Sequence, residues 1–145
     1  MREKSIDHIL RATWQGVAKM YNEEASKYGA TMAIAFTLLN IDKDGTPSTA
    51  LGPKMGMEAT SLSRTLKNME EKGLIIRKPN PNDGRSVLIM LTDYGVKMRN
   101  VSKEKVIQFN DIIAQNISEE KITHFYEVSA LINELIQNKK IFNNN

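Results

Sequence analysis

Residues 58–73 of this 145-residue chain, EATSLSRTLKNMEEKG, predict the amphipathic helix that decides the fold. At about 100° per residue, Leu62, Leu66 and Met69 lie on one side of the helix, which predicts that this side packs on a core. The glycine that closes the stretch suits the left-handed turn that often follows a helix. The predicted helix is therefore Glu58–Lys72.

The opposite side of this helix carries groups of the kinds that recognise DNA. Arginine can bind guanine O6 and N7 together, asparagine can bind adenine, and hydroxyl or ammonium groups can bind phosphates. A polar face that only contacts solvent is the alternative interpretation. The candidate DNA contacts here are Thr60, Arg64 and Lys67, with Ser61 and Asn68 at the flank.

A short helix is predicted before this stretch and a β-hairpin after it. Ser48–Gly56 predicts the short helix, with Ser48 as N-cap, and Pro53 is tolerable there only within the first turn. The apolar segments Leu74–Arg77 and Val87–Leu91 predict two strands joined by a polar tip. Two short helices and a hairpin in this order predict a winged helix-turn-helix.

The predicted hairpin carries a second group of candidate DNA contacts. Arg77 and Lys78 leave the first strand, and Arg85 enters the second. Asp83 lies two residues before Arg85 and can brace it. An arginine on a projecting loop suits the negative potential of a narrow minor groove. A surface hairpin with scattered charges is the alternative.

Helices are also predicted on both sides of this winged module. Ser5–Tyr28 and Thr31–Asn40 precede it, a long helix capped by Thr92 follows it, and Ser118 caps the last helix. The predicted fold class is mainly α with a small β-hairpin wing. We expect one domain, residues 1–145, with a DNA-binding lobe at 46–92 and helical dimerisation arms at 1–30 and 96–145.

The net charge of +3 lies in the predicted lobe. Residues 46–92 hold seven basic and four acidic side chains, while those of the remaining chain cancel. A local excess of positive charge is typical of a polyanion-binding module. The chain has no cysteine, which excludes disulfides and thiolate metal sites and fits a cytoplasmic location. No apolar run has the roughly 18 residues of a membrane span, and no secretory signal is visible.

The predicted arms carry more apolar side chains than a small module can cover. Burial against a second copy predicts a two-fold homodimer, whereas packing of the arms within one chain is the alternative. The apolar positions concerned are Phe109, Ile112, Ile113, Ile117, Ile122, Phe125, Ile132, Leu135 and Ile136.

A group of aromatic residues in the first helix is a candidate ligand site. Trp14, Tyr21 and Tyr28 recur every seven residues and share a helix face, with Met32 and Phe36 placed to lie opposite. They can line a pocket for a small aromatic ligand. A role in the core or in the dimer contact is the alternative.

An enzyme finds little support in the sequence. No phosphate-binding or nucleophile motif is present. His124 with Glu127 offers two metal ligands at most, whereas a catalytic zinc needs three. We expect no catalytic residues, metal or cofactor. The main alternative to a DNA-binding protein is a winged helix that binds another protein.

Ser48–Gly95 resembles the winged-helix core of the MarR (multiple antibiotic resistance regulator) family. The similarity lies in the helix start Ala59–Arg64, the helix end Met69–Ile75, the wing Asp83–Arg85 and the stretch Leu91–Gly95. The Glu-Lys-Gly-Leu, Asp-Xaa-Arg and Leu-Thr-Xaa-Xaa-Gly pieces have the order and spacing of the family.

This resemblance implies a homodimeric transcription regulator, usually a repressor, that a small ligand often releases from DNA. It implies major-groove contacts by Thr60, Ser61 and Arg64, and a minor-groove contact by Arg85. Glu58 and Ala59 stand where many members have polar or basic residues, and Pro53 in the preceding helix is a second departure. These departures bear on the operator sequence and affinity.

Overall fold

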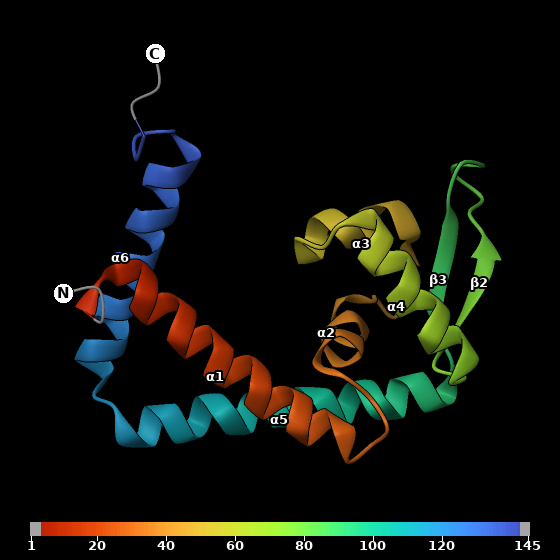
Figure 1. Ribbon diagram of the computed structural model, residues 1–145. Helices are drawn as coiled ribbons and strands as arrows, with labels where there is room; N and C mark the ends of the chain where they lie inside the picture. Colours follow the sequence, from red (N-terminus) through yellow and green to blue (C-terminus); the bar gives the residue numbers. More distant parts are fainter. Residues whose placement is uncertain (1–3, 143–145) are drawn as a thin grey trace. The chain divides into compact units, whose positions relative to one another are not determined.

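The computed structural model describes residues 4–142, which form helices and one small antiparallel sheet (Figure 1). Residues 1–3 and 143–145, the ends of the two predicted arms, lie outside the described residues. The helices are α1 (Ile6–Ser26), α2 (Met32–Asn40), α3 (Ser48–Met55), α4 (Ala59–Glu71), α5 (Asp93–Asn116) and α6 (Glu119–Gln137). The strands are β1 (Thr46–Pro47), β2 (Ile75–Pro79) and β3 (Val87–Leu91).

The chain divides into two compact units, with the boundary inside α5. The first unit extends through Lys103 and holds the winged helix-turn-helix together with α1, α2 and the start of α5. The second unit begins at Glu104 and holds the rest of α5 and α6. Among the described residues, no helix is long and apolar enough to cross a membrane.

Side-chain caps begin α1, α2 and α6 at the predicted helix starts, although Thr31 is predicted as a helix residue and not as a cap. The Ser5 hydroxyl accepts a hydrogen bond from the His8 backbone N–H at the start of α1. The Thr31 hydroxyl accepts one from the Ile34 backbone N–H at the start of α2. Ser118 accepts one from the N–H of Lys121 at the start of α6. Such caps satisfy N–H groups that have no partner inside the helix. The predicted helix starts are confirmed here.

Helix α3 differs from the sequence prediction in two respects. Its N-cap is Pro47 and not Ser48, and Pro53 lies beyond the first turn. The expectation that this helix tolerates Pro53 only within its first turn is therefore wrong. Gly52 precedes this proline, and a residue without Cβ removes one of the contacts that disfavour a helical residue before proline. The helix ends soon after, at the left-handed Gly56.

The sheet contains one more strand than the predicted hairpin. β2 and β3 pair antiparallel, with Ile75 opposite Leu91 and Pro79 opposite Val87, which confirms the hairpin. β2 starts one residue later and ends two residues later than predicted. The two-residue strand β1 pairs with the other edge of β3, so the strand order is β1-β3-β2.

The core of the first unit lies where α2, α3 and α4 meet the sheet. Leu62, Leu66 and Met69 of α4 are buried, which confirms the predicted inner face. They pack in one cluster with Leu38 of α2 and Ile89 of β3. Burial of a leucine or isoleucine side chain contributes about 1.5–3 kcal/mol. This cluster holds α4 with its polar face outward.

Hydrogen bonds tie the end of α4 to the start of α5. The Thr92 hydroxyl donates to the Gly73 carbonyl over 2.6 Å and accepts from the Gly95 N–H. The Thr92 N–H donates to the Leu74 carbonyl over 3.1 Å. Gly95 is buried directly against that same carbonyl. The orientation of α4 is therefore coupled to α5.

Candidate nucleic-acid interface

The outward face of α4 is exposed along its length. Thr60, Ser61, Arg64, Lys67 and Asn68 all belong to this face and are exposed. Neither cation of this face forms an ion pair within residues 4–142, so their charge is not neutralised. The structure thus brings the five predicted α4 residues together on one surface.

The wing tip presents Arg85 to solvent. Its side chain is 93% exposed, and its Nε lies 3.3 Å from Oδ1 of Asp83. The same oxygen accepts a hydrogen bond from the Arg85 backbone N–H over 2.9 Å, so Asp83 braces the arginine as predicted. Asn80 steadies the tip by donating to the Ser86 hydroxyl over 2.9 Å.

Other basic residues of the lobe differ in whether their charge is free to bind a polyanion. Lys78 on β2 is exposed, and no ion pair involves it in the described part of the chain. Arg77 places its Nε 3.4 Å from Oε2 of Glu70 and so links β2 to α4. Lys54 donates to the Asn40 carbonyl over 2.9 Å and pairs with Asp42. Pairs of this kind reduce the charge that a polyanion can use.

Within residues 4–142, the residues of the predicted aromatic ligand site have different surroundings, and Tyr28 alone among them belongs to the cavity described below. Tyr21 and Phe36 pack edge to face with ring centroids 5.4 Å apart, and burial raises the pKa of the Tyr21 hydroxyl. Trp14 is exposed. Met32 follows the cap of α2, where its backbone N–H donates to the Asn22 side chain. Tyr28 instead lines a cavity whose other members are not predicted site residues.

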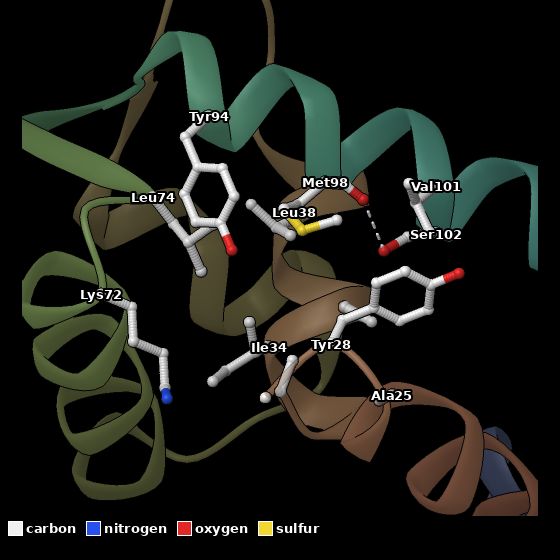
Figure 2. A pocket seen from close by; sticks show the side chains of 13 residues that line it. Ala25, Tyr28, Ile34, Leu38, Lys72, Leu74, Tyr94, Met98, Val101 and Ser102 are labelled. Atoms are coloured by element: carbon white, nitrogen blue, oxygen red, sulfur yellow. Dashed lines mark hydrogen bonds between the residues drawn. The ribbon is translucent and has the colours of Figure 1, made fainter.

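This cavity has a volume of about 220 Å³ (Figure 2). Its walls come from the end of α1, from α2, from the residues after α4 and from the start of α5. Lys72, Leu74 and Tyr94 are among them, next to Ile34 and Leu38. No periodic pattern in the sequence could have found a site whose members come from so many elements.

The histidine region of α6 has no metal-site geometry. His124 lies 3.8 Å from Glu120 and 3.4 Å from Glu127, both within the same helix. Within residues 4–142 no group of three suitable side chains converges on a point that could hold a metal ion.

The arrangement of these elements defines a class of protein. A short helix, a turn and an exposed second helix, followed by a projecting antiparallel hairpin, form a winged helix-turn-helix. The model of the MarR family matches residues 36–87, which include α3, α4 and the hairpin up to the start of β3.

A relative from Bacillus subtilis extends this match over most of the chain. It is the organic hydroperoxide resistance transcriptional regulator, which is 31% identical over 106 residues, covering 72% of this chain and 69% of the relative. The chain therefore belongs to the MarR family of transcriptional regulators, and the family resemblance of the sequence is confirmed.

Two further comparisons agree with this assignment. The uncharacterized HTH-type transcriptional regulator YdgJ of Bacillus subtilis is 31% identical over 88 residues. That match covers 61% of this chain and about half, 54%, of the relative. The MepR–DNA complex of S. aureus superposes with a TM-score of 0.81 at 18% identity, covering 90% of this chain and 98% of that one. This likeness confirms the predicted fold class.

Proposed function

We propose that this chain is a sequence-specific DNA-binding repressor that binds a pseudopalindromic operator as a homodimer. The observation that carries the proposal is the outward face of α4, where Arg64 and Lys67 are exposed and unpaired within residues 4–142. A polar helix face of this kind, held by a buried apolar face, suits the major groove of B-DNA.

The α4 side chains divide by chemistry into base-reading and phosphate-binding groups. Arg64 can bind guanine O6 and N7 together, and Asn68 can bind adenine. Thr60, Ser61 and Lys67 suit phosphate oxygens, which fix the position of the protein on the duplex. Arg64 is accordingly assigned to base recognition.

The wing adds a second contact region. Arg85 projects from a tip that Asp83 and Asn80 order, so its guanidinium is presented for the negative potential of a narrow minor groove. Lys78 on the neighbouring strand suits the flanking phosphates. Arg77 contributes through its ion pair with Glu70, which supports the position of β2 beside α4.

Arg85→Ala should weaken binding to sites with A/T-rich flanks and lower the magnitude of the salt slope by roughly one per subunit. The reason is the loss of one cation from the minor groove. Fluorescence anisotropy with labelled duplexes over a range of salt concentrations measures both quantities. Unchanged affinity and slope would remove the wing from the interface.

The homodimer is supported by the apolar surface of the second unit. Phe125, Leu131 and Ile136 of α6 are each 59% exposed. So many exposed large apolar side chains mark an interaction surface. A two-fold dimer would place two recognition helices roughly 34–36 Å apart, facing successive major grooves.

The dimer predicts a specific behaviour in size-exclusion chromatography with light scattering. The chain should elute as a dimer at micromolar concentration, and Leu131→Glu should shift it toward monomer because the charge would be buried in the interface. Asn133→Glu, an exposed polar position on the same helix, is the control. A compact monomer of the unmodified chain would contradict the dimer.

Release from DNA by a small ligand is part of the proposed function. A ligand that fits one spacing of the two recognition helices better than the other shifts the population toward that spacing. Trp14, Tyr21, Tyr28, Met32 and Phe36 stay predicted ligand residues. A repressor bound to its operator keeps the transcription machinery off that DNA. A ligand that releases the repressor lets the machinery bind again.

The salt dependence of binding tests the DNA-binding function against the protein-binding alternative. Affinity for a duplex should fall with salt at a log–log slope near −0.9 for each phosphate neutralised. Absent or salt-insensitive DNA binding would reject the proposal and favour a winged helix that binds protein.

A further inference from the structure

We propose that Asp83, in the loop at the tip of the wing, is a site of isoaspartate formation, and that this modification frees Arg85 from its brace and weakens DNA binding. The loop joins β2 to β3 at the projecting end of the hairpin (Figure 1). The modification stands on the chemistry and geometry of the loop itself, whereas the effect on DNA rests on the proposed function.

The reaction is an attack of the backbone on the side-chain carboxyl. The Gly84 nitrogen bonds to Cγ of Asp83 and loses its proton, and one carboxyl oxygen leaves with that proton as water, so that a cyclic succinimide forms. Water then adds to one of the ring carbonyls and the C–N bond at that carbonyl breaks. Opening at Cγ restores aspartate, whereas opening at the main-chain carbonyl leaves the chain connected through Cγ. The product has the same mass as the starting chain.

The Gly84 nitrogen is accessible for this attack. Its N–H forms no hydrogen bond within residues 4–142. Gly84 is exposed, and in the described part of the chain no atom other than its chain neighbours lies within 4 Å of the place where a Cβ would stand. A glycine carries no Cβ, so it hinders the approach of its own nitrogen to a carbonyl carbon less than any other residue does.

The carboxyl of Asp83 is held beside this nitrogen. Its Oδ1 accepts a hydrogen bond from the Arg85 backbone N–H over 2.9 Å. A bond from a side chain to the backbone two residues later closes a ring across the intervening residue, which here is Gly84. The Asp83 side chain is therefore folded back over the peptide group that attacks it.

The chain contains a matched Asp-Gly pair in different surroundings. Asp44 is also exposed, but the N–H of Gly45 donates to the Asp42 carbonyl over 2.9 Å. Gly45 has a φ of 97°, and the Met90 sulfur occupies the place where its Cβ would stand. Attack there requires this packed turn to open first, which costs free energy before the reaction begins. We therefore expect Asp83 to convert and Asp44 to resist.

Isoaspartate alters the part of the loop that orders the wing arginine. The main chain lengthens by one methylene group, and the former main-chain carbonyl of Asp83 becomes a free carboxylate. That carbonyl accepts the Ser86 N–H over 3.3 Å, and the carboxyl that braces Arg85 becomes part of the main chain. Arg85 then has no fixed direction, so ordering it in a minor groove costs conformational entropy.

Incubation of the unmodified chain at physiological temperature and mildly acidic pH, followed by peptide mass spectrometry, tests the site. Mild acid raises the fraction of neutral carboxyl groups, the form that loses water. Electron-transfer dissociation distinguishes isoaspartate from aspartate by cleavage of the additional main-chain bond. Isoaspartate should form at least about tenfold faster at Asp83 than at Asp44, which corresponds to an activation barrier lower by roughly 1.4 kcal/mol.

Gly84→Ala tests whether the neighbouring nitrogen is the attacking group. Its Cβ meets open space among the described residues, so the fold accommodates it. The added Cβ should slow conversion of Asp83 and leave Asp44 unaffected. Equal rates at the two aspartates, no isoaspartate at Asp83, or an unchanged rate in Gly84→Ala would each overturn the site.

The effect on DNA is measured on protein whose isoaspartate content is known. The modified form should bind duplexes with A/T-rich flanks about threefold to tenfold more weakly, the range expected for one lost hydrogen bond. Protein L-isoaspartyl methyltransferase with S-adenosylmethionine should restore affinity, because it methylates the free carboxylate, methanol leaves, and the succinimide forms again and reopens in part to aspartate.

Arg85→Ala is the matched control for this effect. Its DNA affinity should not change on incubation, because the side chain that the modification displaces is absent. An equal loss in Arg85→Ala, or isoaspartate without any loss of affinity in the unmodified chain, would overturn the effect on DNA alone. A chain that binds no DNA would reject the proposed function, while mass spectrometry would still decide the site.

Discussion

Gly95→Ala should lower the free energy of unfolding by about 2–3 kcal/mol, the size expected when a buried site has no room for an added group. A Cβ at this position would overlap the Leu74 backbone carbonyl and press on the Leu91 side chain. The Leu74 carbonyl belongs to the backbone, so it cannot rotate away from the added Cβ as a side chain could. The variant must therefore shift α5 away from the end of α4 or lose the junction at Thr92. Urea denaturation followed by circular dichroism measures the change.

Gly16→Ala in α1 is the matched control. It is also a helical glycine, but within residues 4–142 no atom other than its chain neighbours and the nearby backbone of its own helix lies within 4 Å of the place where its Cβ would stand. Alanine favours a helix over glycine by up to about 1 kcal/mol, so this variant should be slightly more stable than the unmodified chain. If Gly95→Ala were as stable as Gly16→Ala, close contact of Gly95 with the Leu74 backbone would be excluded.

Arg64→Ala should cost about 1–3 kcal/mol in operator affinity, between fivefold and more than a hundredfold, and relax the preference at one base pair in each half-site. The arginine is exposed on the outer face of α4 and has no acidic partner within residues 4–142. Its loss removes two hydrogen bonds to one guanine without leaving a buried charge behind. Anisotropy titrations against the operator and its single-base variants measure both effects.

Arg11→Ala controls for the loss of charge, since it removes an exposed arginine from α1. It should leave the preference at every base pair unchanged. A loss of affinity in Arg64→Ala that is equal for all sequences would assign Arg64 to a phosphate. No loss at all would remove α4 from the major groove.

Much of the fold could be predicted from the sequence because its signals are local. The spacing of Leu62, Leu66 and Met69 reports directly which side of α4 is buried. Ser5, Thr31 and Ser118 cap helices by contacts within three residues, so the sequence contains both partners of each bond. The exposed face of α4 could be predicted as well, because its polar residues lie on the side of the helix opposite the buried ones.

Features that depend on distant residues could not be predicted. β1 has two residues and exists because Thr46 and Pro47 pair with β3, more than forty residues later. The ion pair of Arg77 with Glu70 depends on how β2 packs beside α4. The cavity at Lys72 needs the end of α1 and the start of α5 to meet, and neither has a pattern that indicates it.

Selection of bound sequences from a pool of random duplex DNA at physiological salt tests the central claim most directly. We predict enrichment of a pseudopalindrome whose half-sites are about 10–10.5 base pairs apart, or a multiple of that spacing, with A/T-rich sequence where the wings would lie. The Arg64→Ala variant should enrich the same spacing with one position relaxed in each half-site. A pool that stays random after repeated rounds would contradict the account of this chain as a sequence-specific DNA-binding regulator.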